Sequence, residues 1–121
     1  MAHIKRKHRD LLVWQESVNL TVAIYGITES FPKSELFGLT SQLGRSAASV
    51  PANIAEGAAR SGTAELLRFL SIANGSLSEV DTHLEIADRL GYLPDRKMLD
   101  EKVERVFRLL SGLIASLKKK R

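Results

Sequence analysis

One stretch of the chain, residues 42 to 60, limits the possible folds most strongly. It reads QLGRSAASVPANIAEGAAR, a helix-forming run made mostly of small side chains, with Pro51 inside it. Proline in a helix interior removes one backbone hydrogen bond and crowds the carbonyl four residues earlier, here that of Ala47, at a cost of about 3 kcal/mol. Because small side chains let a neighbouring backbone come close, we expect a second helix to support the proline. We place that contact at Asn74 and Gly75.

Hydrophobic periodicity predicts four helices and no strand. The two cleanest patterns repeat with alternating spacings of four and three residues, as in the seam between antiparallel helices that cross at about 20°. These patterns are Leu66, Leu70, Ala73, Leu77, Val80, Leu84 and Ala87, followed by Leu99, Val103, Val106, Leu110, Leu113 and Leu117. The predicted fold class is all-α, an antiparallel up-down-up-down four-helix bundle.

Turn and cap residues predict where the helices begin and end. The candidate N-caps of the four helices are Asp10, Ser34, Thr63 and Asp95. Gly91 is expected to end the third helix in the left-handed conformation that glycine adopts at low cost. These boundaries leave connections of only a few residues between helices, as antiparallel neighbours require.

The first predicted helix has apolar residues on two sides, whereas the interior of a single bundle needs only one. One stripe consists of Leu11, Trp14, Val18, Thr21 and Tyr25, and the other of Val13, Leu20, Ile24, Ile27 and Phe31. We therefore expect the chain to form a homo-oligomer. The predicted subunit interface consists of Val13, Leu20, Ile24 and Ile27.

Length and composition restrict the class of protein. The 121 residues fit one domain, with basic arms at about 1–9 and 118–121. The lack of cysteine excludes a disulfide framework and a thiolate zinc site, and it favours a cytoplasmic location. The longest uncharged apolar run, residues 17 to 28, is shorter than the roughly 20 residues that span a bilayer, so we expect no membrane contact.

The net charge of +4 conceals an uneven distribution. Residues 5 to 9 and 118 to 121 each hold four Lys or Arg, which leaves 10 basic against 14 acidic residues between them. An up-down-up-down bundle brings both termini and the turn between its second and third helices to one end, so we predict a basic rim there that contacts RNA or DNA phosphates. The predicted rim consists of Lys5, Arg6, Lys7, Arg9, Arg60, Arg68, Lys118, Lys119, Lys120 and Arg121. Solvated tails without a partner are the alternative interpretation, and the sequence offers no stacking surface of the kind found in single-strand binders.

No pattern in the sequence predicts catalysis, a cofactor or a metal ion. Glu79 and His83 are one helical turn apart, but a carboxylate di-iron bundle needs a Glu-x-x-His motif on each of two helices. Residues 57 to 62 contain two glycines but lack the lysine and the preceding strand of a phosphate-binding loop. We therefore predict that the chain is not an enzyme.

Three polar residues, Asn53, Glu56 and Asn74, lie within stretches of small side chains. One interpretation makes them a ligand site. The structural interpretation, which we favour, is that they satisfy backbone groups freed by Pro51 and fix the register of adjacent helices.

Several spaced motifs resemble one known protein family. They are DLLVW from residue 10, SVPANIAEG at 49–57, FLSIANGSL at 69–77 and LGYL at 90–93. Over residues 10 to about 115 the chain resembles the four-helix-bundle proteins named for intervening sequences in bacterial 23S rRNA. Relatives in that broad group include the accessory protein of diversity-generating retroelements, a basic bundle that works with a reverse transcriptase. The resemblance implies a homopentameric antiparallel bundle that associates with nucleic acid and defines no catalytic residues, although the acidic middle of this chain departs from those basic relatives.

Taken together, these patterns predict a non-enzymatic oligomeric bundle that binds RNA, DNA or a nucleic-acid enzyme through its basic rim. The alternative is a protein-binding oligomeric scaffold with no nucleic-acid role, in which the acidic body and the second apolar stripe of the first helix recognise partners.

Overall fold

The computed structural model describes residues 6–120, and its regular elements are helices. The four long helices are α1 (Leu12–Thr28), α2 (Leu39–Ala59), α3 (Thr63–Arg89) and α4 (Arg96–Lys119). Two short 3-10 helices, η1 (Lys7–Asp10) and η2 (Lys33–Glu35), precede α1 and α2. No strand occurs within the described range, so the all-α prediction is confirmed.

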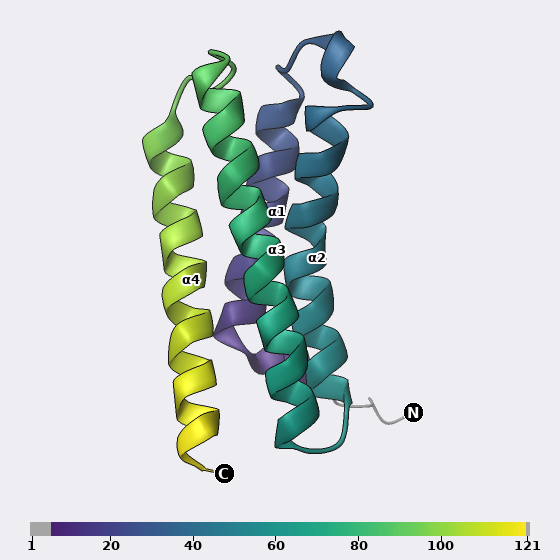
Figure 1. Cartoon of the computed structure of the whole chain (residues 1–121), viewed down its shortest axis with the longest axis vertical. Coiled ribbons are helices and arrows are strands. Elements are labelled where there is room, and N and C mark those ends of the chain that lie inside the picture. Colours follow the sequence, from purple (N-terminus) through teal and green to yellow (C-terminus); the bar gives the residue numbers. More distant parts are fainter. Residues whose placement is uncertain (1–5, 121) are drawn as a thin grey trace.

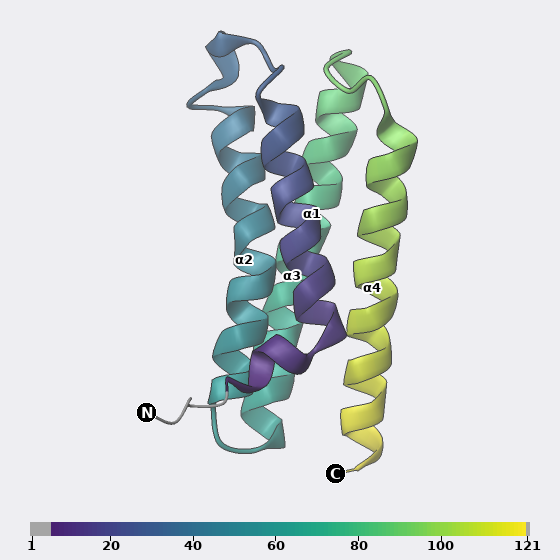
Figure 2. The same cartoon turned by 180° about the vertical axis from the view of Figure 1, so that it is seen from behind.

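The four helices lie side by side and alternate in direction (Figure 1, Figure 2). α2 packs against α1 and α3, and α4 packs against the same two helices, which is the neighbour order of the predicted up-down-up-down bundle. η1, the α2–α3 connection and the end of α4 share one end, called here the terminal end. The opposite end holds the α1–α2 and α3–α4 connections and is called here the loop end. No helix within residues 6–120 is long and apolar enough to cross a bilayer.

A single apolar core runs between the helices. The two seams predicted from the sequence face into it and are buried at Leu70, Ala73, Leu77, Val80, Leu84, Ala87, Leu99, Val103, Val106 and Leu110. At the terminal end of these seams, Leu66, Leu113 and Leu117 are only partly buried. Full burial of a leucine side chain contributes about 1.5 to 3 kcal/mol, so these seams account for much of the stability of the bundle.

The core also absorbs the residues predicted to form a subunit interface, and this corrects the prediction. Val13, Leu20 and Ile24 are 4%, 1% and 0% exposed within the single chain, and Ile27 is partly buried against the same cluster. Side chains this deeply buried cannot reach a second copy without rearrangement of the bundle. The large exposed apolar side chains of α1 are instead Leu12, Val22 and Tyr25.

Pro51 lies inside α2, as the sequence predicts, but its support comes from α1. The carbonyl of Ala47, which loses its helical partner at Pro51, lies 3.0 Å from the hydroxyl of Thr21. The same hydroxyl lies 2.8 Å from the carbonyl of Ser17, so its single proton serves these two acceptors. Asn53 instead donates to the carbonyl of Ser49 at 2.8 Å. A hydroxyl on the neighbouring helix therefore does what we predicted for the amide and carboxylate side chains.

The expected close contact at Asn74 and Gly75 is wrong. Gly75 is exposed, and a Cβ atom built on it would have no neighbour within 4 Å. The close approach between α2 and α3 occurs at Gly57, where a Cβ atom would lie 2.8 Å from the Cβ atom of Phe69. Real Cβ atoms essentially never come that close, so glycine is needed at position 57 for the two helices to pack in this way.

The predicted boundaries at the loop end of α3 and α4 are confirmed. Gly91 has φ of +79°, and the amides of Gly91 and Tyr92 donate to the carbonyls of Asp88 and Ala87, both at 2.9 Å. These two bonds form a Schellman motif, which satisfies the last carbonyls of the helix. Asp95 caps α4 by accepting from the amide of Met98 at 3.3 Å.

The other three predicted N-caps are wrong. The cap positions of α1, α2 and α3 are Leu11, Gly38 and Gly62, where the sequence suggested Asp10, Ser34 and Thr63. Ser34 lies in η2, and the first amide of α2, that of Leu39, donates to Glu35 Oε1 at 3.3 Å. Thr63 is already helical because Gly62, with φ of +95°, takes the position before it.

Candidate nucleic-acid interface

Basic side chains gather at the terminal end of the bundle, as predicted. They come from the segment around η1, the end of α2, the first turns of α3 and the end of α4 (Figure 2). The exposed members are Arg6, Lys7, Arg9, Arg60, Arg68, Lys118, Lys119 and Lys120. Two further predicted members, Lys5 and Arg121, lie outside the described residues. The structure therefore brings four separate parts of the sequence to one basic surface.

The segment expected to be a basic arm is folded from Lys7 onward. η1 packs against α1 and α2, and it is joined to α1 by a bond from Gln15 Nε2 to the carbonyl of Arg9 at 2.7 Å. The Trp14 ring meets the His8 ring edge-on, with 4.9 Å between centroids, and the Arg9 guanidinium lies 5.4 Å from its centroid. These contacts hold the cations of η1 close to the bundle surface.

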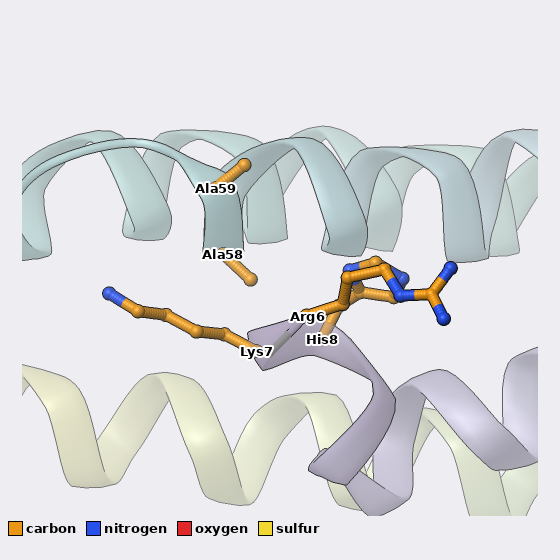
Figure 3. A pocket seen from close by; sticks show the side chains of 5 residues that line it. All are labelled: Arg6, Lys7, His8, Ala58 and Ala59. Atoms are coloured by element: carbon orange, nitrogen blue, oxygen red, sulfur yellow. The ribbon is translucent and has the colours of Figure 1, made fainter. Parts of the chain in front are cut away.

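Two adjoining hollows separate η1 from the end of α2. The first, of about 290 Å³, is shown in Figure 3, where Arg6 and Lys7 extend in opposite directions alongside Ala58 and Ala59. The second, of about 310 Å³, shares Lys7 and Ala58 with the first and continues to Arg60 and the start of α3. Small side chains on α2 leave this space open, and cations line it on both sides.

The arginines at the α2–α3 connection converge on one aromatic ring. The guanidinium carbons of Arg60 and Arg68 each lie 5.2 Å from the centroid of Phe69. Arg60 also pairs with Glu56 at 2.9 Å, and Arg68 lies 3.6 Å from Glu65. These exposed ion pairs contribute only about 0 to 1 kcal/mol each, so they restrain the arginines weakly.

Away from this surface, a polar cleft of about 360 Å³ lies between α2 and α3. Its lining consists of Gln42, Arg45, Ser46, Ser49, Ser76, Glu79 and His83. The Ser49 and Ser76 hydroxyls are 2.8 Å apart and link the two helices, while Nδ1 of His83 is buried without a partner among the described residues. Within residues 6–120, no three His, Asp or Glu side chains come close enough together to hold a metal ion.

The order of the helices and the motifs along them agree with one protein family. The sequence profile of the family described as 23S rRNA-intervening sequence protein matches residues 9–112. The chain belongs to this family. Of the basic residues at the terminal end, Arg9, Arg60 and Arg68 lie within the segment that matches the 23S rRNA-intervening sequence family, whereas Arg6, Lys7 and the lysines that end α4 lie outside it.

A solved structure supports the same fold for this 23S rRNA-intervening sequence protein. It is a protein of unknown function from the S23 ribosomal protein family of Bacteroides thetaiotaomicron, with a TM-score of 0.79 and 23% identity. The match covers 86% of this chain and 96% of that one. At this level of identity the likeness concerns the fold alone. A search of curated proteins finds no match.

Sequence reasoning missed the aromatic part of this surface. The sequence patterns place Trp14 only in an apolar stripe and Phe69 only in a motif, yet both rings contact cations of the predicted rim. Adjacency gives one usable signal, because Phe69 directly follows Arg68 in the sequence. The contact between Arg60 and Phe69 depends on how the α2–α3 connection folds back, which no short-range pattern shows.

Proposed function

We propose that this chain binds nucleic acid through phosphate contacts at its terminal end and has no enzymatic activity of its own. The observation that carries the proposal is the convergence of exposed Lys and Arg side chains from four chain segments on one end of the bundle. Clustered cations raise the local potential and attract polyanions, and each neutralised phosphate releases condensed counterions. A nucleic-acid backbone suits this surface because the cations span several elements.

The shape of the surface supports phosphate contact. The two hollows beside η1 give phosphate groups room between Lys7 on one side and Arg60 on the other. Guanidinium groups present several N–H donors in a plane and suit bidentate contacts with phosphate oxygens. Neighbouring carboxylates, Glu56 and Glu65, lower the local potential, so we expect moderate affinity that depends strongly on salt.

The proposal can be tested by moving a matched charge change from one end of the bundle to the other. The variant Lys118→Gln/Lys119→Gln removes two charges from the terminal end, and Lys33→Gln/Lys97→Gln removes two from the loop end. All four lysines are exposed. Fluorescence anisotropy with a labelled RNA duplex measures affinity as salt is raised.

For the unmodified chain, with about four phosphate contacts, we expect a slope of log K against log salt of roughly −3 to −4. The terminal-end variant should weaken binding and reduce the slope by about 0.9 for each phosphate that it leaves unneutralised, and the loop-end variant should bind like the unmodified chain. Equal weakening in both variants would show that net charge alone governs binding. No binding at about 50 mM salt would contradict the proposal.

A second observation favours self-association or protein binding at the loop end. Large apolar side chains are exposed there at Tyr25, Leu36 and Phe37, and Phe37 is 92% exposed. A hollow of about 340 Å³ lies between Tyr25 and Leu36. We propose this surface, in place of the buried residues of α1, as the interface of the predicted homo-oligomer, for which the family resemblance suggests a pentamer.

Light scattering tests this second proposal. Phe37→Ser should shift the assembled mass toward the 13.4 kDa of one chain, because it removes the most exposed apolar group. Leu12→Ser, an exposed apolar position near the terminal end, is the matched control and should leave the mass unchanged. An unmodified chain that already scatters as a monomer at micromolar concentration would contradict self-association.

A further inference from the structure

We infer that the terminal end selects double-stranded over single-stranded nucleic acid, an inference that rests on the proposed phosphate-binding function. Within residues 6–120, the surface offers cations to phosphates but leaves no aromatic face open to a base. Three features support this: the lining of the two hollows, the state of the aromatic rings beside them, and the position of the exposed aromatic rings.

The hollows beside η1 are lined by described residues that include no Phe, Tyr or Trp. Small residues of α2 form one wall, and Arg6, Lys7 and His8 form the other. The second hollow adds Leu11 and Leu66 as its large apolar side chains. A base that entered either hollow would meet aliphatic groups and cations, whereas its phosphate would meet charged partners. The His8 ring already makes an edge-on contact with Trp14.

The aromatic rings beside the cations of the terminal end are covered by the chain itself. Trp14 is partly buried against the core and has the Arg9 guanidinium 5.4 Å from its centroid. Phe69 is 8% exposed, lies against Gly57 and has two guanidinium groups over it. Each cation–π contact contributes about 0.5 to 1 kcal/mol at an exposed site, and a stacking base would have to displace it. The guanidinium groups on Phe69 remain near the ring while their N–H groups can contact phosphate.

The open aromatic rings of the bundle are at the wrong end for this purpose. Tyr25 and Phe37 are both more than half exposed and lie at the loop end. The helix α1, at about 1.5 Å per residue, places roughly 25 Å between the two ends. A single strand held by the basic surface therefore cannot stack its bases on these rings at the same time without crossing the length of the bundle.

Energetics then favour the duplex. Single-strand binders gain about 1 to 3 kcal/mol for each base stacked on an aromatic side chain, and this surface forgoes that gain. Duplex DNA carries one negative charge per about 1.7 Å of its axis, twice the density of one strand. Cations that are spread over one end of a bundle reach more phosphates on a duplex. One additional phosphate contact is worth about tenfold in affinity near 50 mM salt.

The test compares four labelled probes bound to the full chain: an RNA duplex, a DNA duplex and the corresponding single strands, chosen without self-complementarity. Anisotropy titrations at about 50 mM salt should give duplex affinities about tenfold above those of the single strands. The salt slope should be steeper for the duplexes, by about 0.9 against 0.7 for each contact. The RNA and DNA duplex titrations show whether the helical form of the duplex matters.

Trp14 is the single tryptophan of the chain, so its fluorescence reports directly on stacking. Saturation with a single strand should leave its emission unchanged, and strong quenching would overturn the inference. Phe37→Ser, which removes the most exposed ring at the loop end, should leave the single-strand affinity unchanged. Single strands that bind as tightly as duplexes would overturn the inference alone, whereas failure of all four probes to bind would overturn the proposed function as well.

Discussion

The two ends of the bundle use charged side chains in opposite ways. At the loop end, the Arg96 side chain is only 21% exposed and contacts Asp100 at 2.8 Å, Glu85 at 3.1 Å and Asp88 at 3.3 Å. At the terminal end, Arg60 is about half exposed and pairs with the carboxylate of Glu56. The loop end thus surrounds a cation with anions, and the terminal end sets cations beside one another. Charge contributes to the fold at the first end and remains available to a partner at the second.

The means of holding the helices together differ as well. At the loop end, the Tyr92 hydroxyl donates to Glu35 Oε2 at 3.0 Å and so joins the α3–α4 connection to the α1–α2 connection. The hydrogen bond to Glu35 raises the pKa of Tyr92, because the phenol proton is needed to make it. At the terminal end, the close approach of α2 and α3 at Gly57 does the corresponding work without charged groups. An end held by backbone packing can therefore leave its cations free of structural duties.

The largest expected effect concerns the packing at the terminal end. In the variant Gly57→Leu, the new side chain would overlap Phe69, because even a Cβ atom would lie 2.8 Å from the Cβ atom of that residue. We expect the free energy of unfolding to fall by about 3 kcal/mol, at the upper end for overpacking in a core. Urea denaturation followed by circular dichroism measures this change.

Gly75→Leu provides the matched control for that change. Gly75 is also inside a helix but faces open space, so leucine should stabilise the chain by about 0.5 to 1 kcal/mol through its better helix propensity. Similar destabilisation at both positions would show that glycine serves flexibility in these helices, and the difference between the two ends would then be without its packing argument.

The second prediction concerns the charge network at the loop end. Arg96→Gln should lower the free energy of unfolding by about 1 to 2 kcal/mol, because it leaves several carboxylates close together without their shared cation. Arg89→Gln removes an arginine that is 79% exposed and paired with Glu85, and should cost less than about 0.5 kcal/mol. Thermal unfolding of both variants gives the comparison, and equal costs would contradict a network centred on Arg96.

The sequence predicted the regular parts of both ends better than their special contacts. The seams of α3 and α4, Gly91 and Asp95 follow from spacing within one helix, so they could be predicted. The close contact at Gly57 could not, because choosing it over Gly75 requires the rotation of α2 against α3. The same limit applies to α1, where two apolar stripes are visible in the sequence but only the neighbouring helices decide which one is buried.

The candidate site shows the same division. The gathering of cations at one end follows from helix direction alone, so the sequence is enough to place Arg60, Arg68 and the terminal lysines together. The start of α2 is misplaced by local patterns because Glu35 acts across a turn to satisfy the amide of Leu39, and no cap signal marks that contact. The packing of η1 on Trp14 likewise depends on a chain reversal that a charge count cannot predict.

The third prediction separates the hydroxyl from the ring at the link between the two connections. Tyr92→Phe keeps the contact with Phe31, 5.4 Å between ring centroids, but removes the bond to Glu35. We expect the free energy of unfolding to fall by less than it does in Arg96→Gln, because one hydrogen bond is removed and no charge is left without its partner. Because the pKa of Tyr92 is raised in the fold, its contribution is present below pH 10.0 and is lost as the pH rises through the folded value. The stability difference between Tyr92→Phe and the unmodified chain should therefore shrink in strong alkali, as chemical denaturation at several pH values would show.

The smallest expected effect is the acid titration of Glu85. Its pKa lies below the ordinary value of 4.5, chiefly because Arg89 donates a hydrogen bond to it and then because Arg96 does. A lowered folded pKa means that the stabilising contribution is complete above pH 4.5 and is lost as the pH falls through the folded value. The carboxyl carbon of Glu85, followed by NMR, should titrate below pH 4.5, and Arg89→Gln should raise its midpoint more than Arg96→Gln does. The reverse order would place Arg96 first in this pair as well as in stability, and a midpoint at 4.5 in the unmodified chain would mean that the loop end holds its charges no more firmly than the terminal end does.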